Sequence, residues 1–137
     1  MDPIRILTIV TIAMFAVLAV ITVFISMFAK LGQLLEDGKY DEFFRLIDSR
    51  IARLVYPDYN RSYFKLNAHM IKGDWNEAEK LLDDLLARKV SDEQRADLVI
   101  KAFNIYISLS RGKKAKRMLD EIERLDSAKY GDSQQDC

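Results

Sequence analysis

An uncharged stretch near the start of the chain constrains the fold more than any other feature. From Ile6 to Ala29 there are 24 residues without an ionisable side chain, and the polar ones among them are Thr8, Thr11, Thr22 and Ser26. As an α-helix this stretch is about 36 Å long, enough to cross the roughly 30 Å hydrocarbon core of a bilayer with some tilt. We therefore expect a single transmembrane helix over residues 6–29, preceded by a short tail of residues 1–5.

A cleaved signal peptide is the alternative interpretation of this stretch. The apolar core of a signal peptide is about 7 to 15 residues long and ends at a small-x-small cleavage site. The stretch here is longer, and Met27 stands where a cut after Ala29 would need a small residue. A retained anchor is therefore favoured over a cleaved one.

The basic residues next to the anchor bear on its orientation. Lys30, Lys39 and Arg45 follow it, whereas Arg5 is the basic side chain that precedes it. Because cytoplasmic loops are enriched in Lys and Arg, this count favours a cytoplasmic soluble part, although so short an N-terminal tail is also easy to translocate. The lone Cys137 fits a reducing compartment without requiring one.

Small and weakly polar residues form a stripe on the predicted membrane helix. Spacings of three, four and three place them on one helix face: Ala19, Thr22, Ser26 and Ala29. Such a stripe could pack against another membrane helix. The alternative is that these residues, which are common in membrane helices, align by chance.

The composition excludes several classes of function. The 21 Lys and Arg balance 21 Asp and Glu, so we expect no nucleic-acid partner. One His and one Cys cannot build a Cys/His zinc site or a disulfide framework. Because nucleophile, phosphate-binding and nucleotide motifs are also missing from the sequence, we expect no enzyme, no cofactor and no metal, and His69 is expected to pack inside a helix hairpin.

Beyond the anchor the apolar residues recur at helical spacing, which predicts an all-α domain over residues 30–127 and a disordered tail over residues 128–137. Three segments align with one another: GKYDEFFRLIDSRIAR from Gly38, GDWNEAEKLLDDLLAR from Gly73 and SRGKKAKRMLDEIERL from Ser110. Their starts are 35 and then 37 residues apart. A period of this length is typical of helix-hairpin repeats.

Each aligned segment is predicted to be the second helix of a hairpin. The first helices are expected at residues 59–72 and 92–109, the later one with Ser91 as its N-cap. For the earliest repeat the first helix would be residues 25–36, so the anchor would run directly into the domain. Its second helix is expected from Tyr40 to Val55, ended by Pro57.

The stretch from Asn67 to Leu86, NAHMIKGDWNEAEKLLDDLL, resembles the core motif of the tetratricopeptide repeat family. The resemblance implies that Gly73 allows the tight turn, that Trp75 wedges into the hairpin and that Ala78 lies where the helices cross closely. Residues with an equivalent structural role would be Gly38, Tyr40, Gly73, Trp75, Ala78 and Ala115.

In this family the first helices line a groove that captures an extended peptide or a partner helix. The matching positions in this chain are Tyr63, Asn67, Met70, Ile100, Asn104 and Ile107. The resemblance implies that the two asparagines bond the backbone of a bound peptide. The alternative is that they satisfy hydrogen bonds between packed helices. Tyr63 and Ile100 stand where relatives that bind a terminal carboxylate carry Lys or Arg, so we expect no such clamp.

A cluster of basic residues opens the last aligned segment: Arg111, Lys113, Lys114, Lys116 and Arg117. It could contact anionic lipid headgroups or an acidic partner. The alternative is a solvated face paired with Asp120, Glu121 and Glu123, which follow it closely.

Together these features predict a single-pass membrane protein whose short repeat domain binds another protein, as an adaptor, scaffold or assembly factor. The protein partner is unknown, and a second copy of the chain could cover an exposed end of the repeat stack, giving a homo-oligomer. The alternative is a structural accessory subunit of a larger membrane complex, held there by its transmembrane helix.

Overall fold

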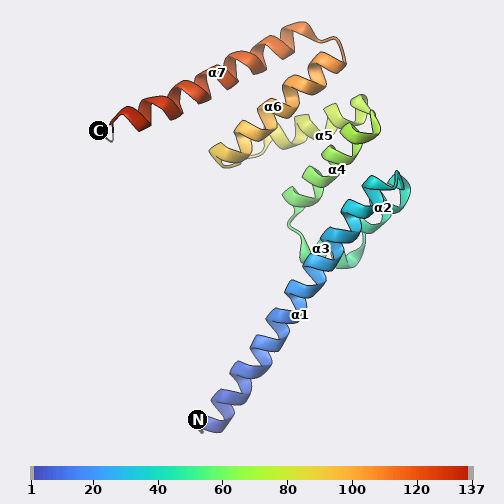
Figure 1. Cartoon of the computed structure of the whole chain (residues 1–137), viewed down its shortest axis with the longest axis vertical. Helices are drawn as coiled ribbons and strands as arrows, with labels where there is room; N and C mark the ends of the chain where they lie inside the picture. The colour runs from blue at the N-terminus through green and yellow to red at the C-terminus, as the bar shows by residue number, and fades with distance from the viewer. Residues whose placement is uncertain (1, 136–137) are drawn as a thin grey trace. The chain divides into compact units, whose positions relative to one another are not determined.

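The computed structural model describes residues 2–135, and every regular element in that range is an α-helix. In chain order they are α1 (Pro3–Glu36), α2 (Tyr40–Ile47), α3 (Arg50–Val55), α4 (Asp58–Lys72), α5 (Trp75–Ala87), α6 (Asp92–Ser108) and α7 (Gly112–Gln135) (Figure 1). The all-α prediction is confirmed. The chain divides into two compact units, Met1–Arg61 and Ser62–Cys137.

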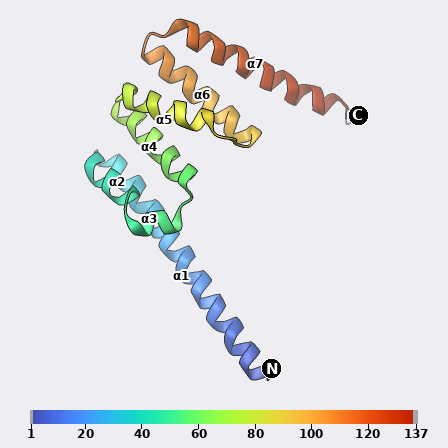
Figure 2. The same ribbon diagram turned by 180° about the vertical axis from the view of Figure 1, so that it is seen from behind.

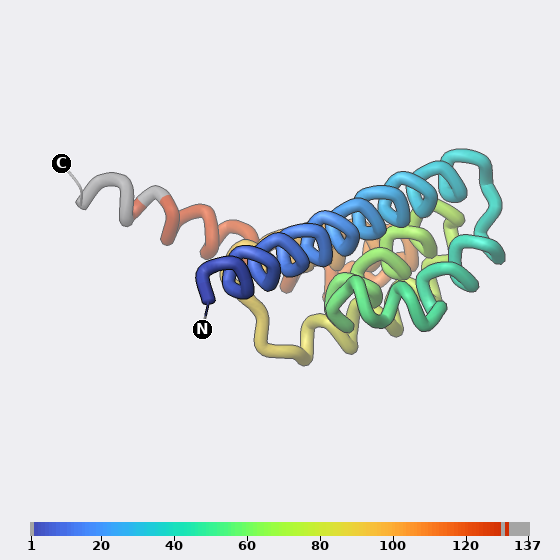
Figure 3. Tube along the Cα trace, turned by 90° about the horizontal axis from the view of Figure 1, so that it is seen from below, coloured from blue at the N-terminus to red at the C-terminus, as the bar shows by residue number. Residues whose placement is uncertain are grey.

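The first unit is dominated by α1, which is 34 residues long and passes through Gly32 without a break. Pro3 lies in its first turn, where the missing amide hydrogen costs nothing. The hydroxyls of Thr8, Thr11 and Thr22 each donate a 2.8 Å hydrogen bond to the carbonyl four residues earlier. The helix therefore satisfies these three hydroxyls with its own carbonyls, as a helix surrounded by lipid must. Figure 3 shows its uninterrupted course from the N-terminus to the turn before α2.

The C-terminal end of α1 forms a small core with α2 and α3 (Figure 2). Leu31 and Leu34 are the buried side chains of α1. The other buried side chains of this unit belong to the two short helices and their end: Phe43, Ile47, Ala52 and Tyr56. The end of α1 is thus the first helix of a hairpin, as the repeat pattern predicts.

The single helix expected from Tyr40 to Val55 is wrong in one respect, because the chain breaks it into α2 and α3. Ser49 is extended, and its hydroxyl accepts a 3.2 Å hydrogen bond from the amide of Ala52. This is an N-cap, which starts a new helix and so ends the old one. The chain changes direction at this break, and Ile47 before it and Ala52 after it are both buried.

The second unit is built from helix pairs in which α5 packs on α6 and α6 packs on α7. Its core consists of Leu66, Ala68, Ala78, Leu82, Leu85, Leu98, Val99, Ala102, Ile105, Tyr106 and Ala115. Ser91 caps α6, and Gln94 completes a reciprocal capping box with it. The predicted N-cap is therefore confirmed.

The three aligned turn residues share one backbone geometry. Gly38, Gly73 and Ser110 have φ angles of 71°, 81° and 57°, all in the left-handed region. In each turn this residue donates its N–H to the carbonyl three residues earlier, and the next residue donates to the carbonyl five residues earlier. That pair of bonds is the Schellman motif, which ends a helix and reverses the chain. The sequence repeat is thus also a repeat of turn structure.

The last helix continues past the end of the aligned segment. α7 is helical through Gln135, so the tail expected over residues 128–137 begins inside it. Ala128, Lys129 and Gly131 are exposed. Cys137 lies outside the described residues.

Candidate functional site

The face predicted to bind a partner lies on α6 and α4 of the second unit. Ile100, Asn104 and Ile107 are exposed and fall on one face of α6, with the two isoleucines 51% and 55% exposed. Tyr63, Asn67 and Met70 of α4 are half-buried. The sequence-predicted residues thus separate into an open set on α6 and a partly covered set on α4, and their role in binding remains a prediction.

Tyr63 connects the two helices. Its hydroxyl donates a hydrogen bond to the carboxylate of Asp97 on α6. The ammonium of Lys101 lies 5.3 Å from the centre of the Tyr63 ring, and its nitrogen is 3.9 Å from an Asp97 oxygen. The two first helices are therefore neighbours, as the proposed groove requires. Tyr63 acts in this arrangement as a structural contact between α4 and α6.

A shallow hollow lies between α6 and α7 beside this face. It is lined by Ala96, Ile100, Ile122, Leu125, Asp126 and Lys129. Ile100 belongs both to this hollow and to the exposed α6 face. Sequence reasoning missed the α7 wall, although Ile122 and Leu125 are apolar residues at helical spacing that could have indicated it.

Two of the five residues of the basic cluster pair with one carboxylate. Glu79 of α5 forms ion pairs with Arg111, at 3.0 Å, and with Lys114, at 3.5 Å. The Lys114 ammonium also lies 5.4 Å from the centre of the Tyr106 ring. Lys113, Lys116 and Arg117 are exposed. The partner of Arg111 and Lys114 thus comes from α5 and not from the carboxylates that follow the cluster, and Glu121, one of those carboxylates, pairs with Arg95.

His69 is half-buried in the α4–α5 hairpin, and its Nδ1 lies 3.8 Å from a carboxylate oxygen of Asp74. Burial lowers the pKa of its imidazole, and the carboxylates of Asp74 and Glu77 oppose that shift. The placement agrees with the expectation that His69 packs inside a hairpin.

The residues assigned structural roles by the resemblance also have places in the fold. Gly38 and Gly73 occupy the left-handed turn positions, and Ala78 and Ala115 are buried at the equivalent point of each second helix. In the first unit that point is Phe43, which is buried as well. Tyr40 and Trp75 are half-buried at the start of α2 and α5.

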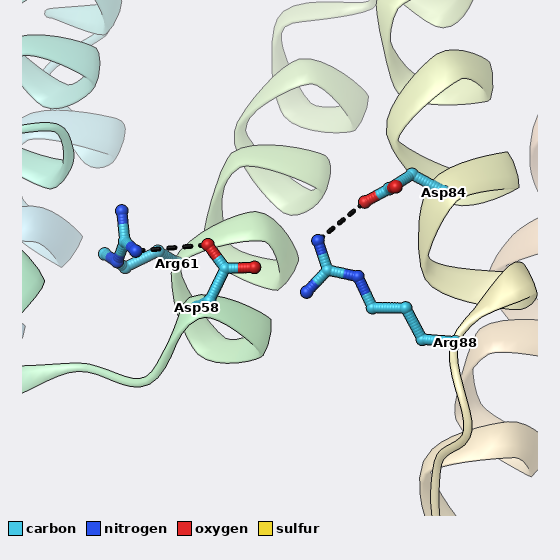
Figure 4. A network of polar contacts seen from close by, with 4 residues as sticks. All are labelled: Asp58, Arg61, Asp84 and Arg88. Carbon is cyan, nitrogen blue, oxygen red and sulfur yellow. Dashed lines mark hydrogen bonds and ion pairs between the residues drawn. The ribbon is translucent and has the colours of Figure 1, made fainter.

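Two further ion pairs lie within single helices (Figure 4). Arg61 and Asp58 of α4 are 3.1 Å apart, and Arg88, the C-cap residue of α5, is 2.7 Å from Asp84 of the same helix. Both are spaced by one helical turn, a geometry that stabilises a helix by a few tenths of a kcal/mol. Neither pair gathers the three or more ligands that a metal site would need, and no such group occurs among residues 2–135.

α1 is the candidate membrane-spanning helix. Within the described residues it is the one helix long and apolar enough to cross a bilayer, and its apolar side chains are exposed. Its length, composition and N-terminal place fit a single membrane span or a signal sequence. Ala19, Thr22, Ser26 and Ala29 are all exposed on it.

Comparison with known proteins does not place the chain in a family. No family model matches it, and no curated protein or solved structure matches it either.

Proposed function

We propose that this protein is a membrane-anchored interaction module in which a short helical-repeat domain, similar to tetratricopeptide repeats, captures a protein partner beside the bilayer. The observation that carries the proposal is the exposed face of α6, where Ile100 and Ile107 flank Asn104. Two exposed isoleucines offer apolar contact, and the amide between them can both donate to and accept from a peptide backbone.

The repeated turns support the resemblance on which the groove rests. The chain reverses through the same two hydrogen bonds at Gly38, Gly73 and Ser110, so the three helix hairpins have the same turn geometry. In arrays of this kind the first helices of successive hairpins line the binding face. Here the first helices α4 and α6 touch through Tyr63 and Asp97.

The anchor in this proposal is α1, retained as a single transmembrane helix with the repeat domain on the cytoplasmic side. Lys30, Lys39 and Arg45 after the span, against Arg5 before it, favour that orientation. The proposal gives the protein no catalytic role.

The groove is tested with the double variant Asn67→Ala, Asn104→Ala in the full chain, expressed where the protein naturally occurs and purified in gentle detergent by an affinity tag. Both changes place a better helix former within a helix, so the fold should persist. The matched control is Asn76→Ala, which alters an exposed asparagine of α5. We expect the double variant to lose the partners that the native chain and the control retain. Full retention by a folded double variant would reject the groove. A co-purified second copy would identify the partner as the chain itself.

A structural accessory subunit is the second candidate. It is favoured by the exposure of the apolar α1 side chains from Ile4 to Val23, which leaves that part of the helix available to other membrane helices. Replacing residues 6–20 with an unrelated apolar sequence of equal length discriminates between the two. The exchange stops before Phe24 because the carbonyl of that residue is bonded by Tyr56. Partners kept after the exchange support the adaptor, and partners lost support the subunit.

A further inference from the structure

The short helix α3 has an exposed apolar face that the small core does not use. Leu54 is 87% exposed and Ile51 is 55% exposed, although both belong to a helix that packs on α1. The side of α3 that faces the core is marked by Ala52, which is fully buried. Two large aliphatic side chains that point away from the core of a six-residue helix form an exposed apolar patch, and such patches mark interaction surfaces.

The position of α3 along α1 is set at both of its ends. At the C-terminal end, the Tyr56 hydroxyl donates a 3.0 Å hydrogen bond to the carbonyl of Phe24, and the two rings are 4.7 Å apart. At the N-terminal end, Ser49 and Lys30 line the same hollow. α3 therefore runs antiparallel to the α1 segment between Lys30 and Phe24, which is about 9 Å long.

That segment of α1 is where the helix would leave the hydrocarbon core. From Ile6, the first residue after Arg5, to Ser26 the helix is about 30 Å long, which equals the thickness of the core. Lys30 is the first charged residue after the apolar stretch. The bilayer is about 40–45 Å thick with its headgroups, so each headgroup layer is about 5–7 Å deep. Of the α1 segment beside α3, the part from Ser26 to Lys30 is about 6 Å long and spans that layer, and Phe24 lies at the edge of the hydrocarbon.

The charges of α3 restrict how deep it can lie. Arg50 and Arg53 are exposed, and an arginine inside the hydrocarbon is strongly unfavourable. A shallower position would expose Ile25 and Phe28 of α1 to water. On a helical projection both arginines lie on one side of Leu54 and Ile51, so a basic edge borders the apolar face. This is the pattern of helices that lie in a membrane interface.

We propose that α3 is an interfacial helix that rests on the bilayer, with Ile51 and Leu54 in the boundary between headgroups and acyl chains and with Arg50 and Arg53 bound to anionic lipid phosphates. The occupant is the lipid surface because α3 continues directly from the membrane helix and carries the complementary charge. The inference rests on the proposed retention of α1 as an anchor.

The test uses the full chain in nanodiscs of mixed phosphatidylcholine and phosphatidylglycerol, with Cys137→Ser and one spin label for each sample. Labels at Leu54→Cys and, independently, Ile51→Cys report on α3. Val17→Cys is the reference for lipid, and Glu42→Cys, exposed on α2, is the reference for water. Accessibility to oxygen and to a water-soluble nickel complex gives the depth of each label. We expect both α3 labels to be intermediate, deeper than position 42 and shallower than position 17.

The role of the arginines is measured on the same labels. Arg50→Gln with Arg53→Gln should raise the nickel accessibility at position 54 in discs that contain phosphatidylglycerol and leave it unchanged in pure phosphatidylcholine. Lys39→Gln, which removes an exposed charge at the far end of the hairpin, is the matched control and should have no effect. If the nickel accessibility at position 54 is unchanged in the double glutamine variant, the proposed binding of anionic lipid by the two arginines is overturned.

The remaining outcomes separate this inference from the proposed function. If position 17 is in lipid and positions 51 and 54 are as aqueous as position 42, the interfacial helix is overturned and the anchor stands. That result would mean that the apolar face of α3 is open to water in the bilayer-bound protein. If position 17 is aqueous, the anchor fails and the inference fails with it.

Discussion

The hydroxyl of Tyr56 donates a hydrogen bond to the backbone carbonyl of Phe24, 32 residues earlier in the chain. Tyr56 is 1% exposed, and burial raises the pKa of its phenol. The bond joins the end of α3 to a carbonyl in the apolar stretch of α1, and the ring of Phe24 packs against the same tyrosine. This residue therefore joins the end of α3 to the helix that could span a membrane.

Tyr56→Phe and Tyr56→Ala should separate the two contributions of this side chain. The phenylalanine keeps the ring contact and loses the hydrogen bond, so it should lower the free energy of unfolding by about 1 kcal/mol. The alanine also loses the buried ring and should cost about 3–5 kcal/mol. Denaturant unfolding of the full chain in micelles measures both values. Equal losses in the two variants would contradict the larger share assigned to the ring.

The three turns predict opposite effects for substitutions at equivalent positions. Ser110 has a φ of 57° without being a glycine, so Ser110→Gly should stabilise the chain by about 1 kcal/mol. Gly73→Ala should destabilise it by about 1–2 kcal/mol for the same reason. An added Cβ at Gly73 meets no atom within 4 Å, so the cost comes from the backbone alone.

Gly32→Ala is the matched control for the turn substitutions. It makes the same chemical change inside α1, where an added Cβ also meets no atom within 4 Å and φ is helical. It should stabilise the chain by about 0.5–1 kcal/mol. Thermal unfolding of the three variants tests the signs, and a gain in Gly73→Ala would show that the turn does not need the left-handed backbone.

The ion pair between Arg95 and Glu121 should contribute more than the pairs within single helices. The guanidinium reaches both carboxylate oxygens, at 2.9 Å and 3.2 Å, and also donates to the carbonyl of Leu86. It thus joins α6 to α7 and to the end of α5. A double-mutant cycle with Arg95→Ala and Glu121→Ala should give a coupling of about 1 kcal/mol.

The control cycle uses Arg88 and Asp84, the i,i+4 pair within α5 shown in Figure 4. Its coupling should be about 0.3–0.5 kcal/mol. Both couplings are read from urea unfolding at low and at high salt. A coupling for Arg95 and Glu121 no larger than that of the control pair would show that bridging between helices adds nothing.

We expect protonation of His69 to lower the free energy of unfolding in mild acid. The pKa of its imidazole is lowered in the fold, so the unfolded chain binds a proton more readily than the folded one. The stability that neutral His69 contributes is fully present above the unfolded pKa of about 6.5, and it is lost as the pH falls through the lower pKa of the folded state. His69→Phe should therefore reduce the decline in unfolding free energy between pH 7 and pH 5.

The titration of His69 can be followed directly. Since the chain has one histidine, a single imidazole signal in the proton NMR spectrum reports its pKa. The expected midpoint lies below 6.5. A midpoint above that value would mean that the carboxylate of Asp74 outweighs burial.

The helices and their turns could be predicted from the sequence because each depends on local signals. Apolar residues at helical spacing indicated α4 to α7, and the aligned Gly38, Gly73 and Ser110 marked the reversals now seen with matching backbone angles. The break at Ser49 was missed, although serine is a preferred N-cap residue and its hydroxyl bonds the amide of Ala52, three residues later. The apolar pattern from Phe43 through Ile47 to Ile51 obscured it.

Contacts between distant parts of the chain could not be predicted in the same way. The pairing of Arg111 and Lys114 with Glu79 joins residues more than 30 positions apart, whereas reasoning from the sequence considered the neighbouring carboxylates. The same holds for the bond from Tyr56 to Phe24. No local pattern encodes such partners, because they depend on how the hairpins pack. The candidate groove came from the resemblance, and its function stays a prediction.

The unbroken course of α1 through Gly32 has a mechanical consequence. The helix that carries the apolar stretch is also the helix against which α2 and α3 pack, and no hinge separates the two parts. A span longer than the surrounding hydrocarbon tilts to fit it. In a bilayer, any such tilt would swing the attached hairpin through the same angle, like a lever turned from inside the membrane. The thickness of the membrane would then set the orientation of the hairpin formed by α2 and α3.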